Sequence, residues 1–114
     1  MMVEIGGRTV AVDEQGFLLD PNGWSEEFVE RTAARDGITL YDESWGLIEY
    51  FREHYQATNM HPSMRQLVMT LGKQHGGHFH DRKEYEKFLY RLFSADPVRE
   101  LCKLAGLPRP EPDT

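Results

Sequence analysis

The chain has 114 residues and a formal net charge of -6, enough for one domain with a single hydrophobic core. The acidic balance disfavours a nonspecific nucleic-acid binder, which needs a basic face to displace counterions from phosphates. One cysteine excludes an internal disulfide framework and fits a reducing compartment, and no apolar run approaches the ~18 residues of a membrane span. With no signal peptide evident in "MMVEIGGRTV", we expect a cytoplasmic protein without membrane contact.

Residues 1–20 have the pattern of a β-hairpin region. The stretches "MVEI" and "RTVAV" flank Gly6-Gly7, a pair that supplies positive φ and suits a tight turn. A second turn is predicted from Asp13 to Gly16, leading into "FLL". Because an isolated hairpin is only marginally stable, this one must pack on the rest of the chain.

Residues 25–106 are predicted to form a helical bundle, and its first two helices have clear starts. Ser25 can cap a helix that runs to about Asp36, where Gly37 is a natural stop. Asp42 can cap the next helix, which runs to about Gln56. The apolar residues of this second helix cover one broad face: Trp45, Leu47, Ile48, Phe51 and Tyr55.

Three further helices are predicted after residue 60. The third opens at Pro62 or Ser63 and ends at Gly76-Gly77, with apolar residues at helical spacing: Met64, Leu67, Val68 and Leu71. The fourth starts from an Asp81…Glu84 capping-box pattern and carries an apolar side: Tyr85, Phe88, Leu89, Leu92 and Phe93.

The fifth helix and the tail complete the predicted architecture. Asp96 followed by Pro97 is an N-cap with proline at the first helical position, and Gly106 closes the helix. Beyond it, "LPRPEP" cannot be helical and is expected to be extended. The prediction is a mainly α, α+β fold in which residues 1–106 form one domain and residues 107–114 form a flexible C-terminal arm.

Cys102 is the candidate reactive residue, and two interpretations are open. Val98, Leu101, Cys102 and Ala105 fall on one helical face, which indicates a small buried side chain with an inert thiol. A reactive thiolate would need exposure and nearby positive charge, which Arg99, Lys103 and Arg109 could supply.

The segment "KQHGGHFHDR" is a second candidate site. His75, His78 and His80, with Asp81, have a spacing that can bind a divalent ion. The alternative is a polar loop that titrates near pH 6 to 7, and this is favoured because a closed metal site normally needs four ligands in fixed geometry. We therefore expect no metal and no cofactor.

The helices near 43–56 and 63–74 form a possible helix-turn-helix pair, joined by "ATNMHP". Such a pair can place its second helix in the major groove of DNA. Only Arg65 and Lys73 are available in the second helix to meet phosphates, so an ordinary helical hairpin of the core is favoured.

The chain resembles the DsrC/TusE family of sulfur-relay proteins, also described as the gamma subunit of dissimilatory sulfite reductase. The similarity runs through "DEQGFLLDPNGWSEEFVE", "GITLYDESWGLIEYFREHY" and "HPSMRQLVMTLGK" to "FLYRLF" and "CKLAGLPRP". The last of these stretches is the most specific. The resemblance implies an N-terminal hairpin, a helical bundle and a C-terminal arm, as the local patterns also predict.

The resemblance also implies which cysteine would carry sulfur, and this chain departs from the pattern there. Family members carry sulfur on the penultimate residue of the arm, which is Asp113 in this sequence. Cys102 matches the family's upstream cysteine, so it is the one candidate catalytic residue that remains. A cycle through an intramolecular disulfide is impossible with one thiol.

The function implied is that of a DsrC/TusE-like protein of sulfur metabolism, related to carriers that serve dissimilatory sulfite reductase or tRNA 2-thiouridine formation. It would act by protein contact as a sulfur-transfer component, not as a stand-alone enzyme. The implied partners are sulfur-relay proteins or sulfite reductase, and the chain is expected to be a monomer. The alternative is a regulatory or DNA-binding member without sulfur-transfer chemistry, in which any contact with nucleic acid would be made through the helix pair.

Overall fold

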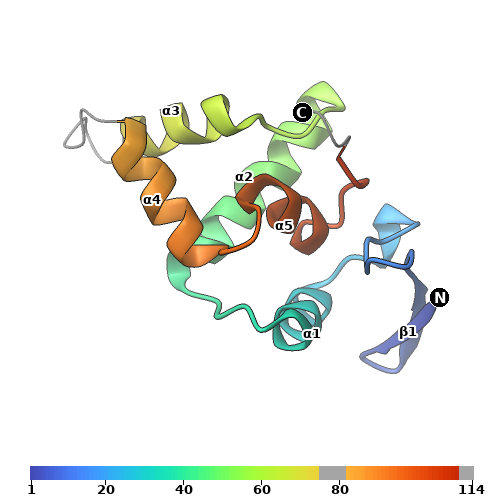
Figure 1. The fold of residues 1–114 in the computed structure, drawn as a ribbon. Coiled ribbons are helices and arrows are strands. Elements are labelled where there is room, and N and C mark those ends of the chain that lie inside the picture. Colours follow the sequence, from blue (N-terminus) through green and yellow to red (C-terminus); the bar gives the residue numbers. More distant parts are fainter. Residues whose placement is uncertain (75–81, 111–114) are drawn as a thin grey trace.

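The computed structural model describes residues 1–74 and 82–110, and it confirms the mainly α, α+β architecture. An N-terminal hairpin is followed by a short 3-10 helix, η1, at Pro21–Gly23 and then by helices (Figure 1). The bounds of the elements are β1 Met2–Ile5, β2 Arg8–Ala11, α1 Glu26–Asp36, α2 Asp42–Thr58, α3 Met64–Gln74, α4 Arg82–Leu92 and α5 Pro97–Leu104. None of the helices in the described ranges is long and apolar enough to cross a membrane.

The hairpin packs against α1, as its marginal stability in isolation requires. β1 and β2 pair antiparallel, and Gly6 and Gly7 turn the chain with φ of 56° and 80°. The strands and the following loop form a small core with Phe28 of α1, and its buried members are Ile5, Val10, Val12, Leu18 and Phe28. The predicted second turn is confirmed by a hydrogen bond from the Gly16 amide to the Asp13 carbonyl, with a length of 3.0 Å.

Two of the predicted helix starts are confirmed in their capping atoms. The Ser25 side chain accepts a hydrogen bond from the Phe28 amide at the start of α1. The Asp96 side chain accepts one from the Arg99 amide at the start of α5, where Pro97 follows the cap. Both ends therefore satisfy an amide that the helix itself leaves without a partner.

The predicted start and end of α2 need correction. Tyr41, not Asp42, is the N-cap, and Asp42 is the first helical residue. The Tyr41 amide donates a hydrogen bond of 3.1 Å to the hydroxyl of Ser44, whose side chain is buried. The last helical residue is Thr58, two residues beyond the predicted Gln56. The C-cap that follows it, Asn59, has a left-handed φ of 61°. Asp42 still favours the helix through its charge in the first turn.

The start of α3 is stabilised by two reciprocal hydrogen bonds between Ser63 and Gln66. Met64 is the first helical residue, and the Ser63 hydroxyl accepts from the Gln66 amide while the Gln66 side chain accepts from the Ser63 amide. This reciprocal pair is a capping box, so Ser63 rather than Pro62 is the cap. The predicted stop at Gly76-Gly77 and the predicted Asp81 cap lie outside the described residues.

Helix α5 is the centre of the fold, although it is the last element of the chain. It packs against α1, α2 and α4, while α3 packs mainly on α4, and Figure 1 shows α5 enclosed by these helices. Its buried face consists of residues with no exposed surface: Leu101, Cys102, Leu104 and the adjoining Ala105. The arm therefore leaves the molecule from the main core.

An ion pair joins α1 to α5 and makes their packing dependent on pH. Lys103 Nζ lies 3.0 Å from Asp36 Oδ2, and the two side chains are 15% and 22% exposed. Burial raises the pKa of Asp36, but the contacts with Arg35 and Lys103 outweigh it and hold that pKa below 3.8. Because the folded pKa is depressed, this carboxylate stabilises the fold above the unfolded pKa, and its contribution is lost as pH falls through the folded value.

Replacing Asp36 by asparagine should reduce the free energy of unfolding at pH 7 by about 1 kcal/mol. Urea unfolding at pH 7 and at pH 3 measures the effect. The difference between the two proteins should shrink at the lower pH, because the wild-type carboxyl becomes protonated there. A penalty of the same size at both pH values would show that the charge contributes nothing.

Candidate docking site at the root of the C-terminal arm

The root of the arm is held to the body by three hydrogen bonds. The carbonyl of Leu104 accepts from the Trp24 indole Nε1 at 2.8 Å, and the carbonyl of Ala105 accepts from Arg52 Nη1 at 2.9 Å. The Leu107 amide donates to the Cys102 carbonyl at 2.9 Å. Carbonyls at a helix C-terminus have no partner within the helix, so these bonds satisfy groups that burial would otherwise leave unpaired.

Arg52 of α2 connects the root to Trp24. Its guanidinium carbon lies 3.8 Å from the centroid of the Trp24 ring, a cation-π contact in which the ring also shields the cation from water. Burial lowers the pKa of Arg52, although a guanidinium remains charged at neutral pH. One cation thus ties together α2, the loop before α1 and the end of α5.

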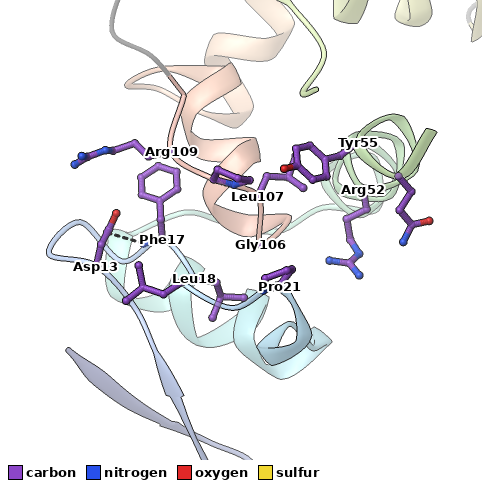
Figure 2. Close-up of a pocket in the computed structure, with 12 residues that line it drawn as sticks. Asp13, Phe17, Leu18, Pro21, Arg52, Tyr55, Gly106, Leu107 and Arg109 are labelled. Atoms are coloured by element: carbon purple, nitrogen blue, oxygen red, sulfur yellow. Dashed lines mark hydrogen bonds between the residues drawn. The ribbon is translucent and has the colours of Figure 1, made fainter. Parts of the chain in front are cut away.

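A cavity of about 370 Å³ lies beside this root (Figure 2). Its walls come from the 13–21 loop, the second half of α2 and the start of the arm. Among the lining residues, Phe17, Leu18 and Leu107 are buried, whereas Pro108 and Arg109 are exposed. In Figure 2 the Tyr55 side chain points across the cavity toward the arm. The walls are mainly apolar, so the cavity can accept an apolar group of a docked partner.

Charges of opposite sign flank the cavity at its outer end. Burial raises the pKa of Asp13, but hydrogen bonds from the amides of Phe17 and Gln15 and the charge of Arg109 outweigh it and lower that pKa below 3.8. The Phe17 amide lies 3.0 Å from Asp13 Oδ1, the bond drawn in Figure 2. Both Asp13 and Arg109 line the cavity, and the charge of Arg109 stabilises the Asp13 carboxylate.

Leu107, which the sequence assigns to the arm, is only 5% exposed and belongs to the main core. Pro108 and Arg109 then emerge at the surface. A boundary at residue 106 for the arm stays a prediction, but the packed part of the described chain extends through Leu107.

Cys102 lies in the core at the root of the arm, with no exposed surface. Burial, with a smaller contribution from the charge of Asp96, raises the pKa of its thiol to about 12. A thiol with so high a pKa is almost entirely protonated at pH 7. This geometry favours the packing interpretation, and a reactive role for Cys102 stays a prediction.

The other two candidate sites gain no support from the described residues. His75, His78, His80 and Asp81 lie outside them, and within them no group of three or more histidine, cysteine or carboxylate residues is placed to hold a metal ion. The two helices of the proposed DNA-binding pair, α2 and α3, are joined by residues 59–63. They do not pack mainly on each other: α2 packs mainly on α5, and α3 packs mainly on α4.

Sequence reasoning missed the roles of Trp24 and Arg52. The only signal was positional: Ile48, Arg52 and Tyr55 have helical spacing, which places a cation on the partly apolar face of α2. A cation in that position needs a partner to offset its burial. The partners, an aromatic ring and a carbonyl, are distant in sequence and could not be identified from that pattern.

The fold and the arm root define a class: a small helical domain whose C-terminal arm starts within its core. The chain belongs to the DsrC family. The family described as "DsrC like protein" matches residues 4–112. The match ends one residue before Asp113.

Curated relatives and solved structures agree with this assignment. The proteins named "Sulfurtransferase TusE" of Pectobacterium atrosepticum and Yersinia pestis are 37% and 36% identical, each over 96% of both chains. The NMR structure of Allochromatium vinosum DsrC has a TM-score of 0.83 at 34% identity, covering 96% of this chain and 95% of that one. The crystal structure of the oxidized gamma-subunit of the dissimilatory sulfite reductase from Archaeoglobus fulgidus has a TM-score of 0.81 at 32% identity, covering 97% of each.

Proposed function

We propose that this chain is a sulfur-relay protein that acts by docking its arm into a partner and does not itself carry sulfur at the end of the arm. The observation that carries the proposal is the state of the thiol: Cys102 is the only cysteine, and it has no exposed surface. At the position where the family resemblance implies the carrier cysteine, the chain has Asp113. A carboxylate cannot form a persulfide.

The partner proposed is the protein that the relatives' names indicate: a sulfurtransferase of a relay, or dissimilatory sulfite reductase, in the cytoplasm. The arm starts from a root fixed by Trp24 and Arg52, which fixes its point of exit. Pro108 and Pro110 restrict the following backbone, so less conformational entropy is lost when it docks. Both features favour insertion of the arm into a partner's channel.

A persulfide donor tests the chemical half of the proposal. Transfer requires a protein thiolate to attack the outer sulfur of the donor persulfide, with the donor thiolate as the leaving group. The folded protein should therefore gain no sulfur atom by intact mass spectrometry, whereas Asp113→Cys should gain one. Alkylation of Cys102 in urea, but not in buffer, serves as the control that the thiol is present and protected.

The contrary result would be a gain of one sulfur by the wild-type protein that is lost in Cys102→Ala. This would establish Cys102 as the carrier and refute the proposal. Because the thiol is buried, such carriage would require the C-terminal end of α5 to open.

Truncation tests the docking half. Ending the chain after Leu107 removes residues 108–114, which include the exposed Pro108 and Arg109, but keeps the residue that packs in the core. We expect this truncated protein to remain folded and to lose binding to purified dissimilatory sulfite reductase or to the sulfur-relay proteins of the same source, measured by calorimetry. Equal affinity of both lengths for the partner would show that the arm does not dock.

A further inference from the structure

A second cleft, of about 540 Å³, lies between α2 and the residues at the start of α1. Trp24 and Trp45 form its aromatic part, and both are half-buried. Its other lining residues include Glu26, Glu49 and Glu53, all exposed. The cleft adjoins the cavity at the arm root, with which it shares Arg52 and Gln56, but the exposed arm residues Pro108 and Arg109 do not line it.

The three carboxylates of the cleft are not neutralised by the fold. Within residues 1–74 and 82–110, no cation forms an ion pair with Glu26, Glu49 or Glu53. The cation that also lines the cleft, Arg52, is engaged with the Trp24 ring and the Ala105 carbonyl. The site therefore has an excess of negative charge and repels phosphate or nucleic acid.

The aromatic rings add a preference for cations. Indole has the strongest attraction for a positive charge over its face among the aromatic side chains. Arg52 demonstrates this in the same cleft, where its guanidinium lies 3.8 Å from the Trp24 centroid. Carboxylates beside tryptophan rings fit a lysine or arginine side chain of another protein.

Gly46 lines the cleft at a position where the described fold does not require a glycine. It lies inside α2 and lines the cleft, where glycine is less favourable for a helix than alanine. Its φ is not positive, and a Cβ atom added there would have no heavy atom within 4 Å. The described fold therefore gives no reason for a glycine here, whereas close approach of a backbone from outside would.

Gly46, Glu49 and Glu53 are spaced so that they follow one another along one face of α2. We propose that this face and the two tryptophans form a docking surface for a partner segment that carries lysine or arginine, with its backbone passing over Gly46. The surface does not include the exposed arm residues Pro108 and Arg109, so it adds a second contact with a partner beside the arm.

The two tryptophans of the protein both line this cleft, so intrinsic fluorescence reports on its occupancy. The probe is a short acetylated and amidated peptide that repeats Ala-Lys-Ala-Arg, with an Ala-Glu peptide as the charge-reversed control. We expect the basic peptide to change the fluorescence in a saturable way and the acidic peptide to have no effect. The protein truncated after Leu107 should bind it equally, which separates this surface from the arm.

Gly46→Ala gives the decisive variant because its two expected effects have opposite directions. It should raise the melting temperature by about 3 °C, as a better helix former, and weaken peptide binding about tenfold through contact with the new methyl group. The control Ala57→Gly, exposed on the same helix but not lining the cleft, should lower the melting temperature and leave binding unchanged.

Charge is tested by Glu49→Gln against Glu4→Gln, which removes an exposed carboxylate from β1. Only the first should weaken binding, by at least about threefold, the loss expected for one ion pair at the surface. The proposal is overturned if the peptide leaves the fluorescence unchanged, or if Gly46→Ala and Glu49→Gln bind it as the wild type does. A fluorescence change on raising the protein concentration alone would identify a second copy as the occupant, and would also overturn it.

Discussion

Replacing Gly106 by alanine should reduce the free energy of unfolding by about 3 kcal/mol, measured by urea denaturation. Gly106 has a φ of 73°, in the left-handed region that costs a residue with a side chain about 1 to 2 kcal/mol. An added Cβ would also lie 2.8 Å from Trp24 Cδ1 and 3.1 Å from Leu18 Cδ1. Because Trp24 is held by its bond to the Leu104 carbonyl, it cannot move aside without breaking that contact.

Gly7→Ala is the matched control for this substitution. Gly7 has a φ of 80°, close to that of Gly106, but a Cβ atom there would meet nothing within 4 Å. The control should therefore cost only the backbone strain, about 1 kcal/mol. If the two variants lost equal stability, close packing of Trp24 on the arm root would be refuted.

The features that the sequence predicted correctly are local ones. The hairpin depends on Gly6-Gly7, and the starts of α1 and α5 depend on Ser25 and Asp96, each acting on an amide three residues away. Helical periodicity, which is also local, gave burial as one of the two interpretations of Cys102, and the structure agrees with that one. Each of these patterns is contained in a few neighbouring residues, so no tertiary contact is needed to recognise it.

The start of α2 shows where local reasoning fails. Asp is a strong N-cap residue, yet Asp42 is inside the helix because Ser44 is buried and bonds back to the Tyr41 amide. Several residues near a helix start can act as the cap. The choice among them depends on which side chain the core buries, and that is a tertiary property.

The candidate site was only partly predictable for the same reason. The presence of the arm and the replacement of its carrier cysteine by Asp113 could be inferred from the family resemblance. The hydrogen bonds that hold the root of the arm to the body could not. The Trp24 indole and the Leu104 carbonyl are 80 residues apart, and Arg52 and Ala105 are 53 apart. Contacts of this range leave no periodic pattern in one sequence, so the structure was needed to show how the arm root is held.

Arg52→Ala should reduce the free energy of unfolding by about 3 kcal/mol, the sum of a hydrogen bond from a charged donor and a cation-π contact. The loss includes the unpaired Ala105 carbonyl, whose donor Arg52 lies at 2.9 Å in the wild type. Arg31→Ala is the control, since its ion pair with Glu27 has a distance of 4.0 Å between side chains that are 59% and 45% exposed. That exposed pair contributes about 0.5 kcal/mol at most.

Arg52→Lys separates charge from geometry at the same position. Lysine keeps the positive charge but lacks the planar guanidinium that stacks on Trp24 while donating to the Ala105 carbonyl. We expect it to recover less than half of the loss in urea unfolding. The arm should also dock more weakly in both variants, because a loosened root adds conformational freedom that is lost on binding. Full recovery by lysine, in stability and in partner affinity, would show that charge alone holds the arm root.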